Sequence, residues 1–362
     1  MLYHFLYPLK EHWFILNLFR YITFRTAYAT ITAFLICFLL GPYFIRLLKR
    51  IQGNGAIRED VPERHINKIG TPSMGGVFIL FSIVVSVLLW ADLTNRYILF
   101  ALATTTVMGF IGFVDDYLKL IVKKPAGLGV RYKFPIEMLI GLTVGFILYF
   151  YPFSDGFSTV VTVPFFKEIV INLGILYILF VSLVIVGSAN AVNLTDGLDG
   201  LAIGIIVFAS IAYGGMAYVV GNIKFATYLQ ILFVKGTGEL TVFMGAILGA
   251  SIGFLWFNTY PAEVFMGDTG SLSLGTAIGT TAVLIKQELL LVIVGGVFVI
   301  EALSVMLQVV YFKLSGGRRL FKMSPIHHHF ELKGIPEPKV IVRFWIVAAI
   351  FAILSLSTLK IR

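Results

Sequence analysis

The sequence predicts an all-α polytopic membrane protein with about ten transmembrane helices. Of its 362 residues 58% are hydrophobic and only 13% are charged, and the mean hydropathy is +0.93. Apolar runs of about 20 residues, enough to cross a bilayer as a helix, recur along nearly the whole chain. These runs are continuous, whereas the strands of a membrane barrel would alternate over roughly ten residues. The composition therefore excludes a soluble globular protein and favours helices over a barrel.

The apolar runs define ten predicted spans in one domain that covers residues 1–362, because no repeat or linker divides the chain. Pro42 is expected near the end of the first span, as a helix breaker should be. The single cysteine, Cys37, excludes an intrachain disulfide. The predicted spans are residues 22–45, 74–91, 97–114, 134–151, 169–187, 200–220, 239–256, 266–284, 289–312 and 340–359.

The basic residues of the loops predict the orientation of the chain. The first, third and ninth loops hold seventeen Lys and Arg, whereas the second, fourth, sixth and eighth hold five. The positive-inside rule therefore makes the odd loops cytoplasmic and both termini periplasmic. The same rule accounts for the net charge of +9, so the charge does not indicate a nucleic-acid partner. Five polar clusters then share the cytoplasmic face: residues 68–73, 115–116, 190–200, 265–268 and 327–329.

The stretch N-A-V-N-L-T-D-G-L-D-G, residues 190–200, lies between two long apolar segments. Aspartates and asparagines are costly at a bilayer boundary unless they do polar work. The alternative is a short interhelical loop in which Thr195 or Asp196 only caps the next helix.

Two further motifs carry carboxylates at span ends. Asp115 and Asp116 close the third span, and acids at a helix C-terminus oppose the helix dipole, which favours a magnesium ion or a base over a solvated helix end. Asp268, in F-M-G-D-T-G, opens the eighth span, where it is either an N-cap or a ligand of a metal-bridged diphosphate.

The motif S-P-I-H-H-H-F at residues 324–330 lies in a basic loop and indicates phosphate contacts, proton transfer or a transition metal. Zinc is disfavoured, because no second His/Cys cluster exists. The stretch K-I-G-T-P-S-M-G-G from Lys68 lacks the spacing of a Walker loop and is a weak phosphate-binding signal. Several carboxylates, many cations and few good nucleophiles together favour phosphoryl transfer at the membrane surface.

These five motifs resemble those of the polyprenyl-phosphate N-acetylhexosamine-1-phosphate transferase superfamily, in family order and over essentially the full chain. The histidine motif resembles the branch that uses UDP-MurNAc-pentapeptide and not UDP-GlcNAc. The resemblance implies a homodimer in the bacterial cytoplasmic membrane that depends on Mg²⁺. It implies transfer of phospho-MurNAc-pentapeptide to undecaprenyl phosphate, which gives lipid I and UMP.

The resemblance also implies roles for residues at matching positions. Asp268 would bind Mg²⁺, Asp115 would deprotonate or position the lipid phosphate, and Asp116 would support that site. Lys68, Asp199 and Phe265 would hold uracil, and Asn193 and Asp196 would lie near the ribose and diphosphate. The catalytic set is then Asp115, Asp116, Asp268, His327 and His328, and the substrate-binding set is Lys68, Ser73, Lys119, Lys133, Asn193, Asp196, Asp199, Asn258, Phe265 and His329.

Alternatives remain at this stage. Two routes are open: direct attack of the lipid phosphate on the nucleotide, and a two-step reaction through a phosphorylated aspartate. A UDP-GlcNAc-using cousin, a secondary transporter and a non-catalytic scaffold are the rival functions. A transporter would carry its ionisable residues near the bilayer midplane. In this chain the motif acids lie at the cytoplasmic ends of the spans, and Glu301 is the main mid-span exception, with a packing or a functional role.

Overall fold

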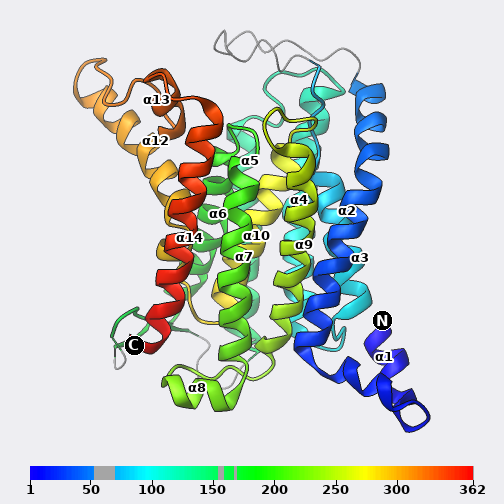
Figure 1. Ribbon diagram of the computed structural model, residues 1–362. Coiled ribbons are helices and arrows are strands. Elements are labelled where there is room, and N and C mark those ends of the chain that lie inside the picture. Colours follow the sequence, from blue (N-terminus) through cyan, green and yellow to red (C-terminus); the bar gives the residue numbers. More distant parts are fainter. Residues whose placement is uncertain (53–69, 154–158, 167–168, 362) are drawn as a thin grey trace.

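The computed structural model describes residues 1–52, 70–153, 159–166 and 169–361 and confirms the all-helical architecture. Long helices run side by side, and both termini lie at the same end of the bundle (Figure 1). By length and composition, eight of the described helices can cross a membrane, and α3 is a shorter apolar helix. The helices at the predicted spans are α2 (Ile22–Gln52), α3 (Gly76–Trp90), α4 (Arg96–Leu120), α5 (Val130–Phe150), α6 (Leu176–Thr195), α7 (Leu201–Val220), α9 (Leu240–Asn258), α10 (Gly267–Leu284), α12 (Gly296–Leu314) and α14 (Glu337–Ile361).

Shorter elements connect these helices. Two strands form an antiparallel hairpin, and short helices lie before α2, between α7 and α9, and on either side of α12. Their bounds are α1 (Leu2–Leu6), η1 (Tyr7–Glu11), η2 (Phe14–Arg20), β1 (Val160–Thr162), β2 (Val170–Asn172), α8 (Ile223–Leu229), η4 (Thr237–Glu239), α11 (Leu291–Val294) and α13 (Ile326–Leu332).

The fifth predicted span is wrong at its start and too short at its end. Residues 170–172 pair with β1 as a strand, and α6 begins only at Leu176, after Gly174 at φ 52°. A short apolar strand and one turn of a buried helix look alike in hydropathy, so the sequence pattern could not separate them. At its other end α6 continues to Thr195, so that much of the 190–200 motif is helical and not a loop.

Two other boundaries also differ from the prediction. Pro42 lies inside α2, which continues for ten residues to Gln52, so this proline does not end the first span. The ninth predicted span is divided at Gly295 into α11 and α12. In Figure 1, α12 leans away from the bundle at the end that carries α13.

Small residues let α10 lie in the centre of the bundle, where every residue from Thr269 to Leu284 is buried. A side chain at Gly76 would overlap the backbone of Gly270, so the start of α3 touches the first turn of α10. Gly275 packs in the same way against α6, and Ser188 Oγ donates a 2.8 Å hydrogen bond to its carbonyl. Close backbone contact of this kind is how membrane helices associate without a hydrophobic driving force. It fixes the N-terminus of α10 between α3, α4 and α6.

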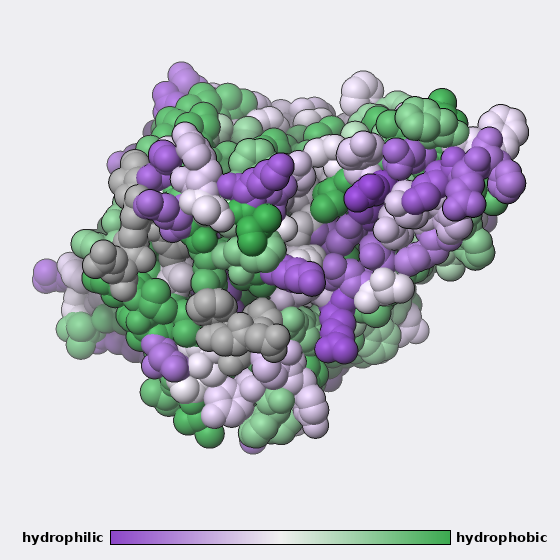
Figure 2. Space-filling model, turned by 90° about the horizontal axis from the view of Figure 1, so that it is seen from below, coloured by the Kyte–Doolittle hydropathy of each residue, from purple (hydrophilic) through white to green (hydrophobic). Residues whose placement is uncertain are grey.

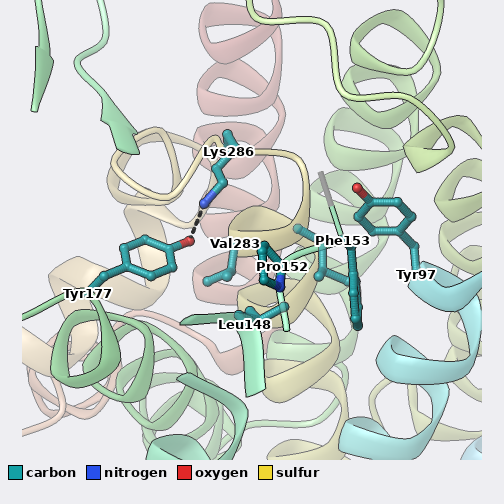
Figure 3. A pocket seen from close by; sticks show the side chains of 8 residues that line it. Tyr97, Leu148, Pro152, Phe153, Tyr177, Val283 and Lys286 are labelled. Atoms are coloured by element: carbon teal, nitrogen blue, oxygen red, sulfur yellow. Dashed lines mark hydrogen bonds between the residues drawn. The ribbon is translucent and has the colours of Figure 1, made fainter. Parts of the chain in front are cut away.

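The end that carries both termini shows hydrophilic side chains mixed with hydrophobic ones (Figure 2). A small pocket at this end is lined by Tyr97, Phe153, Tyr177 and Lys286, among others (Figure 3). Lys286 Nζ donates a 2.6 Å hydrogen bond to the Tyr177 hydroxyl, which donates to Glu288 at 2.9 Å. Burial lowers the pKa of Lys286 to about 8.

Candidate active site

Asp115 and Asp116 lie on the last turns of α4, which extends past the predicted span end to Leu120. Both carboxylates are buried, with 1% and 4% of their surfaces exposed. Lys119 follows Asp115 by four residues, so that its side chain lies on the same face of the helix. The two acids are therefore part of the protein interior and not a solvated helix end.

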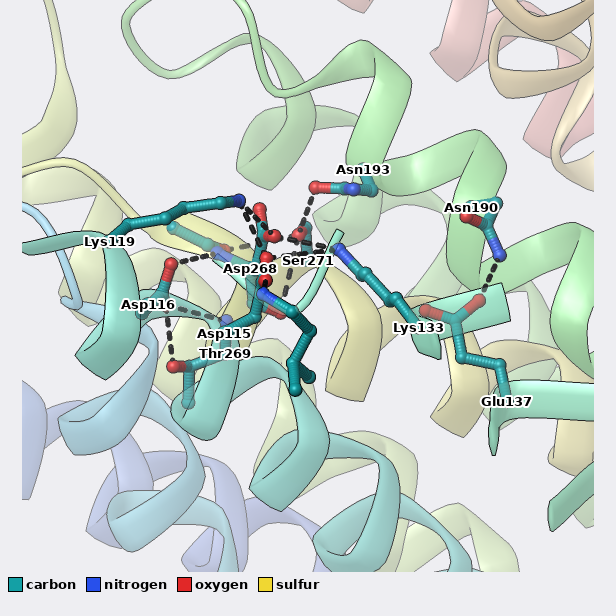
Figure 4. Close-up of polar contacts among 12 residues, drawn as sticks. Asp115, Asp116, Lys119, Lys133, Glu137, Asn190, Asn193, Asp268, Thr269 and Ser271 are labelled. Atoms are coloured by element: carbon teal, nitrogen blue, oxygen red, sulfur yellow. Dashed lines mark hydrogen bonds and ion pairs between the residues drawn. The ribbon is translucent and has the colours of Figure 1, made fainter. Parts of the chain in front are cut away.

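Two lysines join Asp115 to Asp268, which lies 153 residues further along the chain (Figure 4). Lys119 Nζ is 2.6 Å from Asp115 Oδ2 and 2.8 Å from Asp268 Oδ2. Lys133 Nζ, from the first turn of α5, is 2.7 Å from Asp268 Oδ2 and 3.5 Å from Asp115 Oδ2. We call these four residues the ion cluster. It places two carboxylates and two cations within reach of one phosphate-sized ligand.

Asp116 caps the N-terminus of α10. Its Oδ1 accepts from the Asp268 backbone N–H at 3.1 Å, and its Oδ2 accepts from the Thr269 N–H at 2.9 Å and from the Thr269 hydroxyl at 2.7 Å. The N-cap residue of α10, Met266, makes no side-chain bond of its own. The N-cap interpretation of Asp268 is therefore wrong: the capping acid comes from α4, which leaves the Asp268 carboxylate to the lysines.

The capping interpretation of the 190–200 motif is also wrong. Thr195 Oγ1 donates back to the Ala191 carbonyl at 2.8 Å, and α7 has Gly200 as an N-cap without a side-chain bond. Asn193 Oδ1 instead accepts from Ser271 Oγ of α10 at 2.9 Å. Burial, followed by repulsion from the Asp268 and Asp116 carboxylates, raises the pKa of Asp196 to about 7. The motif therefore faces the ion cluster.

Asn258, the last residue of α9, joins this motif to the residues that precede α10. Its Oδ1 accepts from the Gly200 N–H at 3.0 Å and its Nδ2 donates to the Val264 carbonyl at 2.7 Å. Asp199 Oδ2 accepts from the Ala262 N–H at 3.0 Å. These bonds hold the loop before Phe265 against the end of the 190–200 motif.

The residues at the end of the first predicted loop and the start of the next span approach the same place. The Phe265 N–H donates to the Pro72 carbonyl at 2.8 Å, and the Gly75 N–H donates to the Phe265 carbonyl at 2.9 Å. Gln52 holds Ser73 through two bonds of 2.8 and 3.0 Å to its backbone. Lys68 lies outside the described residues.

The three histidines of α13 have different partners. His327 Nδ1 is 3.1 Å from Glu301 Oε2 of α12, and His328 Nδ1 is 2.8 Å from Glu331 Oε2 in its own helix. His329 Nδ1 accepts from the Lys322 N–H at 3.1 Å. Burial and the nearby Lys333 and Lys322 lower the pKa of His329. His327 lies against the 190–200 motif, since a side chain added at Gly197 would overlap its Nε2.

Several residues at the site were not predicted. Glu137 of α5 is fully buried and accepts a 2.6 Å hydrogen bond from Asn190 Nδ2 (Figure 4). A carboxylate within an apolar run was the signal that could have indicated it, because such residues are rarely without a partner. Thr269 and Ser271, by contrast, are ordinary residues for a helix interior, and only the packing of α10 shows their contacts.

The donor set suits a cation that takes part of its shell from a substrate. The described residues contain no group of three or more His, Cys, Asp or Glu side chains placed to hold a metal. Magnesium, however, is usually bound through one or two carboxylates plus substrate phosphates and waters. Asp115 and Asp268 already face shared positive charge from the two lysines. The ion cluster therefore fits such an ion, and not a metal held entirely by the protein.

Comparison with known proteins identifies the family. A model of glycosyl transferase family 4 matches residues 98–286. A phospho-N-acetylmuramoyl-pentapeptide-transferase of Desulforapulum autotrophicum is 57% identical over all 362 residues, which cover 100% of both chains. Proteins of the same name from Syntrophus aciditrophicus and Thermodesulfovibrio yellowstonii are 56% and 54% identical over the same full lengths.

The chain belongs to the phospho-N-acetylmuramoyl-pentapeptide-transferase family. It is accordingly a transferase and a multi-pass membrane protein. The matched part of the family 4 model includes the ion cluster and ends before the histidines of α13. The similarity to the full-length relatives extends through those histidines as well.

Proposed function

We propose that the protein transfers phospho-MurNAc-pentapeptide from UDP-MurNAc-pentapeptide to undecaprenyl phosphate in the bacterial cytoplasmic membrane. The products are lipid I and UMP. The observation that carries this proposal is the 57% identity, over the whole of both chains, to a relative named for phospho-MurNAc-pentapeptide transfer. The ion cluster supports it, because phosphoryl transfer depends mainly on positioning and on neutralising phosphate charge.

In the ion cluster, Asp115 serves the acceptor substrate, the lipid phosphate, and the two lysines serve the donor substrate, the nucleotide. Asp115, at the end of α4, positions the lipid phosphate and takes its proton. Phosphate monoesters have a second pKa near 6, so only a modest base is required. Lys119 and Lys133 exchange their carboxylate partners for oxygens of the nucleotide diphosphate, and direct attack on the β-phosphate follows. Their position between two carboxylates supports this role.

We also propose that Asp268 is the protein's ligand for Mg²⁺, with Asp115 close by. When bound, Mg²⁺ would neutralise the charge on the diphosphate and on the UMP leaving group. Asp116 holds Asp268 in place through the first turn of α10. His327 and His328 complete the phosphate side, with His329 at its edge.

The nucleoside would bind between the end of the 190–200 motif and the loop before α10. Asp199, Phe265 and Lys68 would hold uracil, and Asn193 and Asp196 would contact the ribose and diphosphate. Asn258 and Ser73 support this pocket through the backbone bonds that they make. The family resemblance also supports a homodimer, which the mass of the protein–detergent complex would test.

The test is release of UMP by the purified protein in mild detergent with undecaprenyl phosphate. UDP-MurNAc-pentapeptide and UDP-GlcNAc are supplied separately, each with Mg²⁺ or with EDTA. We expect release from the first donor only, and only with Mg²⁺. Release from UDP-GlcNAc would move the protein to the related branch, and release from neither donor would favour a transporter or a scaffold.

A further inference from the structure

Glu301 is a buried carboxylate in the interior of α12, among apolar residues, and it is not one of the four residues of the ion cluster. Its Oε2 lies 3.1 Å from Nδ1 of His327, and both side chains are fully buried, with 0% of their surfaces exposed. An ionised carboxylate can only accept a hydrogen bond, so with Glu301 ionised this contact places the proton of the imidazole on Nδ1. The pair joins α12 to α13, two elements that lie side by side in Figure 1.

The other ring nitrogen of His327 points toward the substrate-binding motif. Nε2 is buried and has no hydrogen-bond partner among the described residues. It lies where a side chain at Gly197 would be, next to Asp196, which faces the ion cluster. A buried nitrogen without a partner costs free energy, so its place is explained if a ligand completes it.

Packing alone does not explain Glu301. Its Oε1 also has no hydrogen-bond partner among the described residues, and a half-satisfied buried carboxylate is less favourable than an apolar side chain of similar size. His328 and His329 differ from His327, because their partners lie within α13 or in the loop before it. The contact between Glu301 and His327 therefore fixes one histidine from outside its own segment.

We propose that Glu301 is a positioning residue for His327. By accepting the hydrogen bond from Nδ1–H it holds the ring so that the unprotonated Nε2 faces the turn at Asp196 and Gly197, where it accepts a hydrogen bond from a hydroxyl or N–H group of the nucleotide substrate. The contact of Nε2 with substrate rests on the proposed function, whereas the position of the proton on the His327 ring does not depend on it. Carboxylate–imidazole pairs of this kind fix tautomer and orientation in other enzymes.

The experiment compares three variants of the full-length protein in lipid bilayers. Glu301→Gln keeps an oxygen that can accept from Nδ1, Glu301→Leu removes the acceptor, and Ser304→Ala is a matched control. Ser304 is buried one turn away on the same helix, and its hydroxyl donates a 2.7 Å hydrogen bond to the Glu301 backbone carbonyl and not to its carboxylate. Histidine labelled with ¹⁵N, assigned with His327→Gln, reports by solid-state NMR which ring nitrogen carries the proton.

We expect the His327 proton on Nδ1 in the wild type, in Glu301→Gln and in Ser304→Ala, and a redistribution between the two nitrogens in Glu301→Leu. The kcat for UMP release should fall roughly 10- to 100-fold in Glu301→Leu and less in Glu301→Gln. The KM for the donor should change much less than kcat.

An unprotonated Nδ1 in the wild type would overturn the proposal, as would a Glu301→Leu protein with unchanged NMR signals and kcat. If Glu301→Leu does not fold, loss of the Nδ1 proton in Glu301→Gln serves as the opposing result. Failure of the wild type to release UMP would contradict the proposed function, while the NMR signals would still decide the role of Glu301.

Discussion

Asp116 should act through the fold of α10 and not directly on the substrate, which the substitution Asp116→Asn can test. The carboxylate accepts three hydrogen bonds at the start of α10 and is 4% exposed. An asparagine replaces one oxygen by an NH₂ group that cannot accept, so one or two buried donors lose their acceptor. At about 1–3 kcal/mol for each unsatisfied group, the free energy of unfolding should fall by about 1–6 kcal/mol.

The assay is chemical unfolding in mixed micelles, followed by tryptophan fluorescence, together with UMP release. Thr269→Val is the matched control, because it removes only the hydroxyl donor and should cost about 1 kcal/mol. Release of UMP should fall in Asp116→Asn, since Asp268 occupies the first turn that Asp116 holds. The reasoning is refuted if Asp116→Asn unfolds like the wild type yet releases no UMP, because Asp116 would then act on the substrate itself.

Two further predictions concern either end of the molecule. Gly197→Ala should abolish most UMP release, because its methyl group would displace the His327 ring, whereas Gly187→Ala on α6 has open space and should be tolerated. For Lys286, burial lowers the pKa to about 8 from 10.5, so the folded protein binds fewer protons than the unfolded chain between these values. The denaturant concentration at the midpoint of unfolding should therefore increase between pH 8 and pH 10. Lys286→Met removes the titrating group and should flatten this increase. An increase that persists in Lys286→Met would contradict the assignment to Lys286.

Hydropathy predicted the helical class and the place of each long helix, because bilayer thickness imposes a length that a sequence displays directly. It could not predict that Val170–Asn172 form a strand or that α4 continues past the predicted span end to Leu120. The strand depends on pairing with a separate segment, and the last turns of α4 lie beyond the apolar run, so apolar periodicity indicates neither.

The motifs indicated the residues of the site but not their partners. Parity of the loops placed Asp115 and Asp268 on one face, and the structure brings them to the same two lysines. The cap that Asp116 provides to α10 and the contact of Glu301 with His327 join residues that are distant in sequence. Such pairs arise from the packing of α10 and α12, so no local pattern could reveal them.

The ion cluster has a consequence for how the two ligands would enter. Its two carboxylates and two ammonium groups carry no net charge, so the ion cluster by itself needs no counterion from solution. A nucleotide that took the lysines alone would leave Asp115 and Asp268 as unpaired charges in the protein interior. Arrival of a divalent cation gives those carboxylates a new partner at the same moment. Nucleotide and cation should therefore each tighten the binding of the other, by the same factor, as thermodynamic linkage requires.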